Sequence, residues 1–529
     1  MTQTDFDVVV IGAGFAGLYM LHQLRSRGFS VRVYEAGSDI GGTWFWNRYP
    51  GARCDVESLE YSYQFSDELQ QEWEWSEKYA TQGEILTYVN HVADRFDLRR
   101  DVQLNTHIDQ AGFNEESNIW SITTADGDVI SARFCVMATG CLSSTNVPNI
   151  PGLETFAGAT YHTGSWPHTE PEFSGKTVGI IGTGSSAIQS IPLIAETAKH
   201  VHIFQRTPSY AIPAYNGPYD PDYEKDRKEN YAAYREQAKY SRSGFLLSVN
   251  DANASEVSAE ERQRVYDERW RRGGLTFLGA FNDLLTDKQA NDTAADYVRE
   301  KIRAVVKDPD KAQLLSPDTV IGCKRMCVDT NYYQTYNRPN VSLHDVKSNP
   351  IEEITERGIR YGNQEIEVDE IVFATGFDAM TGALMKMDIR GRDGLSLREK
   401  WCEGPKTYLG LTIAGFPNMF IVTGPGSPSV LANMMPAIEH HVEWIADCID
   451  HLRTASRASI EAEDDAEEDW VHQTNEIADR TLFPTCNSWY LGANIPGKPR
   501  VFMPYLGFER YLEECEQVVA SGYKGFKMA

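Results

Sequence analysis

Three glycines near the start of the chain are spaced for binding a dinucleotide. The segment Gly12-Ala-Gly14-Phe-Ala-Gly17 follows a short apolar run and precedes a helical pattern, and Glu35 ends the next apolar run. Glycines allow a tight turn and let a pyrophosphate approach the N-terminus of the helix, while an acid at this distance binds a ribose hydroxyl. The glycine spacing together with its strand, helix and acid therefore predicts a dinucleotide site.

A second copy of this pattern occurs further along the chain. Gly182-Thr-Gly184-Ser-Ser-Ala187 repeats the turn with alanine in the last place, Gln205 stands where the first copy has Glu35, and Arg206 follows. An acid at this position binds the ribose 2′-hydroxyl, whereas an arginine accommodates a 2′-phosphate. We predict FAD or NAD at the first copy and NADP at the second. An Arg206 that is only a surface residue remains an alternative.

Two dinucleotide sites on one chain predict hydride transfer from a nicotinamide to a flavin. Reductases and oxygenases both use this arrangement. A disulfide reductase needs a redox-active cysteine pair beside the flavin, and Cys54 stands alone after the first motif. A reduced flavin without a disulfide acceptor reacts with oxygen, so the sequence favours an oxygenase.

The apolar and helical patterns around these motifs predict an α/β chain with two Rossmann-like dinucleotide-binding domains and a helical insertion. Apolar runs at 6–11, 31–34, 134–140, 177–182 and 200–204 predict buried parallel strands, and residues 209–320 have helical periodicity without a strand pattern. The loop 41–55 is too irregular for a helix or a strand. The predicted domains are an FAD domain (1–140 and 383–529), an NADPH domain (152–208 and 332–380), the insertion (209–331) and linkers (141–151 and 381–382).

Composition narrows the class of protein further. A net charge of −26 argues against a nucleic-acid partner, and the absence of an apolar run of about 18 residues argues against a membrane span. The nine scattered cysteines lack a CxxC pair, and the first strand leaves no room for a signal peptide, so we expect a reduced, cytoplasmic protein. Cys323 and Cys327 are expected to be ordinary thiols. No metal site and no obligatory protein partner are expected.

Two further segments carry a family resemblance. Residues 156–167 match FxGxxxHxxxWP through Phe156, Gly158, His162, Trp166 and Pro167, and residues 41–55 match GGxWxxxxYPGxxxD. With these motifs the chain resembles the type I Baeyer–Villiger monooxygenases along essentially its whole length. Segments 377–384 and 424–434 look most similar to phenylacetone and steroid monooxygenases.

The resemblance implies a specific reaction. NADPH reduces FAD, oxygen adds to form a C4a-peroxyflavin, and this species attacks a ketone to give an ester or a lactone. The implied partners are a ketone substrate and O2, with broad scope for cyclic, aryl or steroid ketones. A flavin monooxygenase that oxidises nitrogen or sulfur centres is the alternative within the same scaffold. A redox-sensing protein that binds nucleotides without turnover is the alternative from another class.

The resemblance also assigns roles to residues that lie far apart in the sequence. Arg325 would stabilise negative charge during oxygen transfer, because arginine stays protonated at any working pH, and Asp55 would pair with it. Lys324 would join Arg206 and Thr207 at the 2′-phosphate. A basic pair at a turn is the alternative for Lys324-Arg325.

The remaining predicted site residues belong to the substrate pocket, the hinge and the two cofactor sites. Leu431 and Met434 are expected to line the substrate pocket, with an apolar core role equally open. Trp489 is expected to cover the nicotinamide, with simple aromatic packing as the alternative. His162 invites assignment as a catalytic base, but its place between the two dinucleotide motifs favours a role in the hinge. The predicted cofactor contacts are Gly12, Gly14, Phe15, Gly17, Glu35, Thr43, Trp44, Trp46, Arg53, Tyr61, Gly182, Thr183, Gly184, Ser185, Ser186, Gln189, Arg206, Thr207, Lys324 and Trp489.

Overall fold

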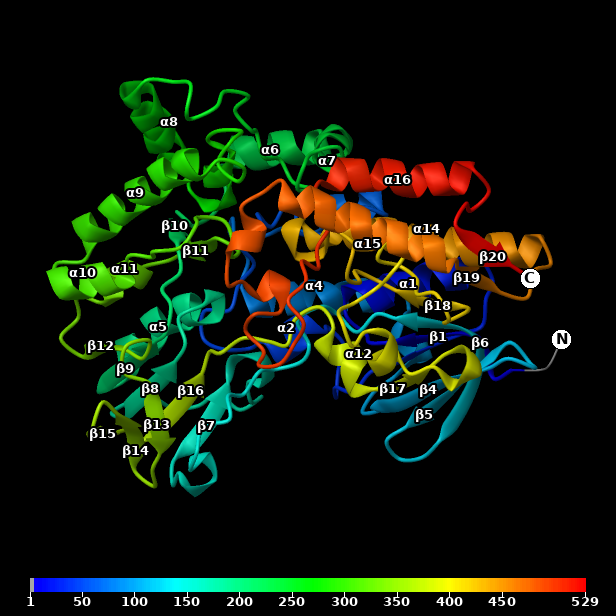
Figure 1. Cartoon of the computed structure of the whole chain (residues 1–529), viewed down its shortest axis with the longest axis horizontal. Coiled ribbons are helices and arrows are strands. Elements are labelled where there is room, and N and C mark those ends of the chain that lie inside the picture. The colour runs from blue at the N-terminus through cyan, green and yellow to red at the C-terminus, as the bar shows by residue number, and fades with distance from the viewer. Residues whose placement is uncertain (1–3) are drawn as a thin grey trace.

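The computed structural model describes residues 4–529 and contains two large sheets, each covered by helices (Figure 1). The first sheet has the strand order β17-β4-β5-β6-β1-β2-β3, and β18 pairs with β6. Its strands are β1 (Phe6–Ile11), β2 (Val31–Tyr34), β3 (Val102–Gln103), β4 (Ile108–Asn114), β5 (Ile119–Thr124), β6 (Val129–Met137), β17 (Asp388–Arg390) and β18 (Met419–Ile421).

The centre of the first sheet is parallel and buried on both faces. β1 pairs in parallel with β2 and with β6, and Val8, Val9 and Val10 have no exposed surface. A continuous apolar run is what a strand covered on both faces requires. α1 (Phe15–Ser26) and α14 (Met434–Thr454) lie together on this sheet, and the Tyr19 hydroxyl donates to Glu443 at 2.8 Å. Residues from both ends of the chain therefore build one domain.

The second sheet is entirely parallel and has the order β12-β9-β8-β16-β7. A small antiparallel sheet of three strands, β13-β14-β15, lies beside it (Figure 1). The strands of these two sheets are β7 (Ala159–His162), β8 (Thr177–Ile181), β9 (His200–Gln205), β12 (Val341–Asp345), β13 (Ile351–Ile354), β14 (Gly358–Tyr361), β15 (Gln364–Glu367) and β16 (Glu370–Phe373). α5 (Ser185–Thr197) follows β8, so each glycine motif lies between a strand and a helix. The predicted fold class is confirmed.

The segment after β9 is mainly helical, as the sequence predicts. It contributes α6 (Pro221–Glu229), α7 (Tyr231–Lys239), α8 (Ala259–Arg272), α9 (Lys288–Val305) and α10 (Pro309–Leu315). The expectation that 209–320 lacks strands was wrong at one place. β10 (Ala211–Pro213) pairs in parallel with β11 (Cys327–Asp329), a contact between distant segments that local periodicity does not reveal.

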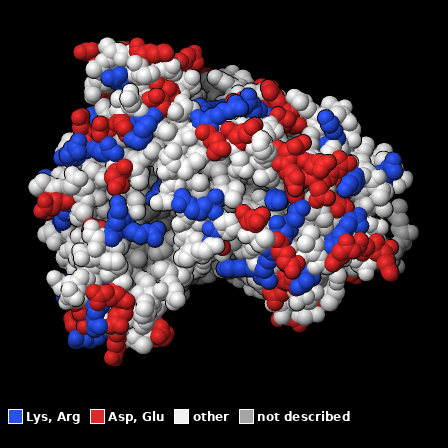
Figure 2. Space-filling model, viewed as in Figure 1, with Lys and Arg blue, Asp and Glu red and all other residues white. Residues whose placement is uncertain are grey.

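Helices α15 (Asp464–Asp479) and α16 (Phe508–Ala520) complete the C-terminal part of the first domain (Figure 1). The acidic run at 461–469 lies largely in α15, where Glu467 is buried and pairs with Lys400 at 2.7 Å. Figure 2 shows acidic and basic side chains interspersed over one face of the molecule, with acids gathered over the first domain. Between residues 4 and 529, no helix combines the length and apolar character needed to cross a membrane.

Two short helices differ from the predicted boundaries. α2 (Thr43–Trp46) forms one turn inside the 41–55 loop, where neither helix nor strand was expected, and its N-cap Gly42 has a φ of 54°. The left-handed backbone at this glycine starts the turn without any capping side chain, so the usual start signal is missing. α12 (Gly382–Lys386) begins inside the predicted linker 381–382.

Candidate active site between two dinucleotide domains

The first glycine turn is closed by backbone contacts that exclude larger residues. Gly12 has a φ of 105°, and a Cβ at this position would lie 2.5 Å from the carbonyl oxygen of Ala138. A Cβ at Gly17 would lie 1.8 Å from the carbonyl oxygen of Gly12. Gly14 caps α1 without a side-chain hydrogen bond, which leaves N–H groups of the first helical turn open to an anion.

Glu35 is buried at the end of β2 beside this turn. Its carboxylate accepts hydrogen bonds from the backbone N–H of Ala13 at 2.8 Å and of Gly37 at 2.7 Å. Each carboxylate oxygen can accept a further hydrogen bond. The carboxylate is therefore held against the glycine turn and can still accept from ribose hydroxyls.

Aromatic residues that the sequence assigns to the first cofactor site pack against one another. The indole N–H of Trp44 donates to the Tyr61 hydroxyl at 3.2 Å, and Phe15 contacts Tyr61 edge to face. Burial raises the pKa of Tyr61 well above its ordinary value, so its hydroxyl stays protonated. Thr43 and Trp46 are exposed on α2.

The second glycine turn has nearly the same backbone as the first. Gly182 has a φ of 111°, a Cβ there would lie 2.4 Å from the carbonyl oxygen of Ala374, and Gly184 caps α5 without a side-chain hydrogen bond. The Thr183 hydroxyl donates to the backbone carbonyl of Thr207 at 3.0 Å. The Ser185 hydroxyl lies 3.2 Å from the Cys327 sulfur.

Two basic residues lie near each other beside this second turn. Arg206 is exposed after β9, and Lys324 comes from the end of the insertion. Burial and the positive charge of Arg206 lower the pKa of Lys324. Among residues 4–529 neither side chain forms an ion pair. Two like charges without a carboxylate partner fit a phosphate group.

Arg325 and Asp55 form the most strongly connected charge pair near the junction of the two domains. Arg325 Nε donates to Asp55 Oδ2 at 2.7 Å and its Nη2 donates to Asp55 Oδ1 at 2.8 Å, while Nη1 donates to the carbonyl of Val430 at 2.6 Å. Burial lowers the pKa of Arg325, but the ion pair and hydrogen bonds with Asp55 outweigh it and raise the pKa above its ordinary value. The guanidinium has further N–H groups that no described residue uses.

An apolar cluster lies around this charge pair. It contains Met380, Val430, Tyr490 and Met503, with Leu431, Met434 and Trp489 partly buried against it. The ring of Trp489 packs on Tyr490 with centroids 4.4 Å apart. Burial raises the pKa of Tyr490 well above its ordinary value, although the positive charge of Arg325 opposes this. Tyr490 and Val430 are not among the site residues that the sequence predicts, although their neighbours Trp489 and Leu431 are.

The stretch 156–167 connects the two domains and is part strand. β7 pairs in parallel with β16 at the edge of the second sheet, and the backbone N–H of Trp166 donates to the carbonyl of Trp46 in the first domain at 3.2 Å. His162 Nδ1 accepts from the Gly164 N–H at 2.9 Å, and burial lowers the pKa of His162. Its imidazole therefore caps the short turn Thr163–Ser165. Phe156, Gly158 and Pro167 are partly buried on either side.

The hydroxyl of Ser186 lies 3.0 Å from that of Thr163, which joins the second glycine motif to the stretch 156–167.

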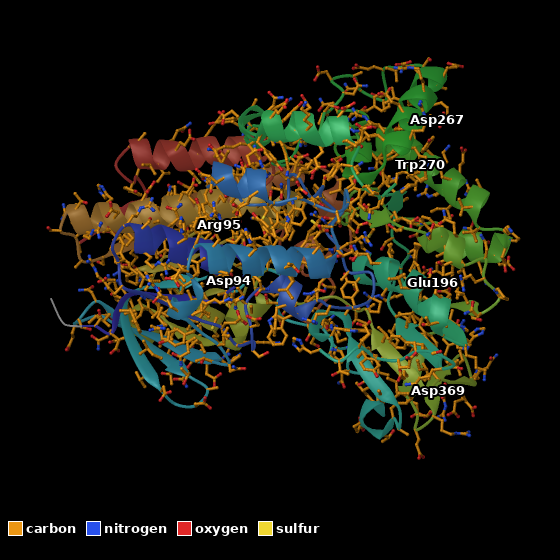
Figure 3. All side chains as sticks on the ribbon, turned by 180° about the vertical axis from the view of Figure 1, so that it is seen from behind. Asp94, Arg95, Glu196, Asp267, Trp270 and Asp369 are labelled. Atoms are coloured by element: carbon orange, nitrogen blue, oxygen red, sulfur yellow. A yellow bond between two sulfur atoms is a disulfide. The ribbon has the colours of Figure 1, made fainter. Side chains whose placement is uncertain are left out.

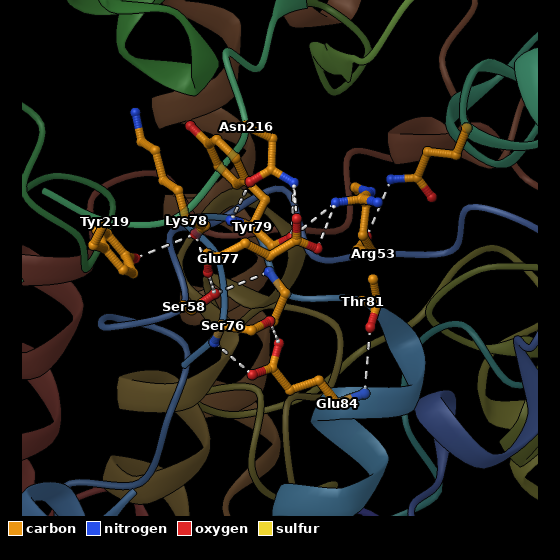
Figure 4. Close-up of polar contacts among 12 residues, drawn as sticks. Arg53, Ser58, Ser76, Glu77, Lys78, Tyr79, Thr81, Glu84, Asn216 and Tyr219 are labelled. Atoms are coloured by element: carbon orange, nitrogen blue, oxygen red, sulfur yellow. Dashed lines mark hydrogen bonds and ion pairs between the residues drawn. The ribbon is translucent and has the colours of Figure 1, made fainter. Parts of the chain in front are cut away.

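The side chain of Arg53, in the 41–55 loop, is hydrogen-bonded to other residues of the first domain. Its Nη1 donates to Glu77 at 3.0 Å and to the carbonyl of Tyr79 at 3.0 Å (Figure 4). Arg53 is thus fixed by protein groups of the first domain.

The expectation of a reduced protein, in which Cys323 is an ordinary thiol, was wrong. Cys323 and Cys486 form a disulfide with their Cα atoms 6.3 Å apart. The fold brings together segments 163 residues apart in the sequence, so the spacing of the cysteines gave no signal. Cys327 is a free, buried thiol, and within the described chain no cluster of His, Cys, Asp and Glu could hold a metal ion.

The two turns fit two dinucleotides by the groups they present. Each offers uncapped helix N–H groups to a pyrophosphate. The first adds a carboxylate that can only accept, which suits ribose hydroxyls, and the second adds Arg206 and Lys324, which suit a phosphate. These residues fit FAD at the first turn and NADPH at the second.

Comparison with known proteins gives the same assignment. Residues 9–255 match the family described as pyridine nucleotide-disulphide oxidoreductase. A Baeyer-Villiger monooxygenase from Pseudooceanicola batsensis is 45% identical over 524 residues, covering 98% of this chain and 95% of that protein. A phenazine N-monooxygenase from Lysobacter antibioticus is 42% identical over 529 residues, covering 99% of this chain and 97% of that protein.

The solved structure of an oxidized steroid monooxygenase bound to NADP is 54% identical, covers 99% of both chains and superimposes with a TM-score of 0.94. The predicted likeness to steroid monooxygenases is confirmed. The chain belongs to the Baeyer–Villiger monooxygenases, flavoenzymes that use FAD and NADPH.

Proposed function

We propose that this enzyme inserts one oxygen atom of O2 next to a ketone carbonyl and releases an ester or a lactone. The observation that carries the proposal is the Arg325–Asp55 pair, which holds a permanently protonated guanidinium with free N–H groups beside the apolar cluster that contains Val430. Oxygen insertion at a carbonyl builds negative charge on the ketone oxygen. A fixed cation in a dry site stabilises that charge far better than one in water.

FAD, which the first glycine turn and Glu35 would hold, would supply the hydride acceptor for NADPH and the means of activating O2. Arg325 supports oxygen insertion through the N–H groups that Asp55 and Val430 leave free. Asp55 fixes the plane of the guanidinium by accepting two parallel hydrogen bonds, a geometry that lysine cannot reproduce. Arg206, Lys324 and Thr207 hold the 2′-phosphate of NADPH.

The substrate class follows from the side chains around the pair. Leu431, Met434 and Trp489 present apolar and aromatic surface beside Arg325. Such a wall discriminates weakly between ketones of similar shape, while methionine adapts to different outlines. We propose cyclic, aryl and steroid ketones as substrates.

A second candidate is oxidation of nitrogen or sulfur centres. The relative from Lysobacter antibioticus, a phenazine N-monooxygenase, favours it, because that protein shares 42% identity across nearly the whole chain. An amine gains oxygen without negative charge building on a carbonyl oxygen, so it needs less from Arg325.

Product analysis after NADPH-driven turnover separates the two candidates. The purified enzyme is given a bulky ketone and an aromatic amine in parallel, and products are identified by mass spectrometry. We expect an ester or lactone from the ketone as the main product. An N-oxide from the amine with no ester from the ketone would replace the first candidate by the second.

We also propose that the ketone and O2 are the only partners the reaction needs and that the enzyme works in the cytoplasm. Both dinucleotide sites and the Arg325–Asp55 pair come from one chain, which supports a self-sufficient enzyme. The cytoplasm supplies NADPH. Activity of the purified chain with FAD, NADPH, O2 and a ketone alone tests the first point, and fractionation of the producing cells tests the second.

A further inference from the structure

Gln189 lies on α5, one turn after the second glycine motif, and both ends of its side-chain amide are used by the first domain. Its Nε2 donates to the backbone carbonyl of Arg53 at 3.1 Å, and its Oε1 accepts from the Tyr49 hydroxyl at 2.7 Å. A carbonyl can only accept, so the orientation of the amide is fixed by its partners. Although Gln189 belongs to the predicted cofactor contacts, this amide is occupied by the loop 41–55.

The backbone of the same loop lies directly against α5. Gly51 has a φ of 80°, and a Cβ there would lie 2.4 Å from the carbonyl oxygen of Gln189 and 3.2 Å from the side chain of Leu193. Only glycine permits this approach. The loop therefore contacts the helix at three alternate residues, Tyr49, Gly51 and Arg53.

The clamped loop leads straight to the charged pair. Arg53 is held on its other side by Glu77 and the carbonyl of Tyr79 (Figure 4). Asp55 follows two residues later and accepts both hydrogen bonds from Arg325. Tyr49 is partly buried, and burial followed by the negative charge of Asp55 raises its pKa above the ordinary value, so its hydroxyl remains a donor to Gln189.

These contacts form one continuous path from the second dinucleotide domain to Arg325. We propose that Gln189 is a positioning residue for oxygen insertion: it holds the Asp55 loop of the first domain against helix α5 and so sets where the Arg325 guanidinium lies. The inference rests on the proposed function, since Arg325 is the group that it positions. Gln189 touches neither Arg325 nor the reacting atoms and acts only through the loop.

The test compares Gln189→Met with wild type. Methionine keeps the length of the side chain and removes both hydrogen bonds, each of which contributes about 1 kcal/mol, so roughly a 30-fold effect is expected. We expect the variant to bind FAD and to keep its KM for NADPH within about threefold, because the glycine turn and Arg206 are intact. The amount of ester formed per NADPH consumed should fall about 30-fold, because Arg325 is no longer held in place.

Tyr49→Phe supplies a milder variant in case Gln189→Met does not fold. It removes one hydroxyl and one hydrogen bond, and a fall of about threefold to fivefold in ester per NADPH is expected. In the double variant the two effects should not add, because both changes remove the same contact. Glu196→Gln is the matched control, since Glu196 is exposed on the same helix (Figure 3), and it should behave as wild type.

Three results would overturn the proposal. A raised KM for NADPH with unchanged ester per NADPH would make Gln189 a cofactor contact. Wild-type values for both quantities would remove it from the reaction, and additive effects of the two substitutions would disconnect it from Tyr49. Failure of the proposed function is recognised separately, because wild type itself would then form no ester.

Discussion

The two glycine turns of this chain have nearly identical backbones and differ in the side chains around them. Gly12 and Gly182 have φ angles of 105° and 111°, and a Cβ on either would lie 2.5 or 2.4 Å from the carbonyl oxygen of Ala138 or Ala374. The helix caps Gly14 and Gly184 share a ψ of −168°. The shared backbone is what a pyrophosphate requires, so it defines a dinucleotide site without specifying which dinucleotide.

The difference lies at the end of the next strand. Glu35 turns its carboxylate toward the first turn and accepts from Ala13. Gln205, its counterpart, instead donates to the carbonyl of Leu314 in the insertion at 2.7 Å, and the next residue, Arg206, is exposed. One or two residues at the end of the second strand therefore decide which dinucleotide a Rossmann turn binds. The direction of these side chains depends on the segments that pack against them.

The largest expected effect comes from breaking each turn in the same way. Gly12→Ala and Gly182→Ala both force a side chain into a left-handed backbone and against a carbonyl, at a cost of about 3 kcal/mol or more, equivalent to over 100-fold in binding. We expect Gly12→Ala to be colourless after purification. Gly182→Ala should stay yellow and lose reduction by NADPH. Flavin absorbance and stopped-flow reduction measure this; loss of the same cofactor in both would contradict the assignment of the turns.

Arg206→Ala tests the residue that we expect to distinguish NADPH from NADH at the second turn. Losing a charged contact to the 2′-phosphate costs about 2–3 kcal/mol, so kcat/KM for NADPH should fall roughly 30-fold to 100-fold while that for NADH stays unchanged. Initial rates of flavin reduction with each cofactor measure the preference. Arg338→Ala, at an exposed arginine of the same domain, serves as control. An equal loss with NADPH and NADH would show that Arg206 does not read the phosphate.

Acid should weaken the second domain through two histidines on its sheet. Burial lowers the pKa of His202 and of His344 to about 4, and the two rings are hydrogen-bonded at 3.0 Å. The unfolded chain binds these protons more readily, so stability is complete above pH 6.5 and is lost as the pH falls toward 4. The loss of stability therefore grows as the pH falls through this range.

His344→Gln keeps a hydrogen-bonding side chain without this titration. Its melting temperature should therefore fall less than that of wild type between pH 7.5 and pH 5. Thermal unfolding followed by fluorescence measures both proteins. A parallel fall in the two would place the acid sensitivity elsewhere.

The smallest effect is expected from Ala187→Gly, at the third position of the second motif. A Cβ at Gly17 would meet the Gly12 carbonyl at 1.8 Å, whereas Ala187 at the equivalent position is accommodated and fully buried. Ala187→Gly should cost about 1 kcal/mol through helix propensity and leave NADPH binding unchanged. Gly17→Ala should abolish FAD retention. Tolerance of Gly17→Ala would show that the first turn can relax as the second does.

The sequence predicts those parts of the molecule that depend on local pattern. Glycine spacing, apolar strands and the residue after each second strand were enough to predict two Rossmann-like domains and their cofactors. The family motifs also named Asp55 and Arg325, which are 270 positions apart and hydrogen-bonded.

Contacts made only by the folded chain could not be predicted in this way. The bond from Arg325 to the Val430 carbonyl, the pairing of β10 with β11, and the Cys323–Cys486 disulfide each join segments without any shared local signal. Gln189 belongs to this group as well. Its motif position indicated a cofactor contact, and its actual partners depend on how closely the loop 41–55 lies against α5.

The most direct test of the central claim follows NADPH consumption and ester formation together in Arg325→Ala. This variant removes the positive charge near the junction and leaves both glycine turns untouched. We expect NADPH to reduce the bound flavin at a rate within about threefold of wild type, while ester from a bulky ketone falls by at least about 100-fold, the effect of losing one fixed charge-stabilising group. Ester formed per NADPH at the wild-type level would contradict the role of the Arg325–Asp55 pair in oxygen insertion.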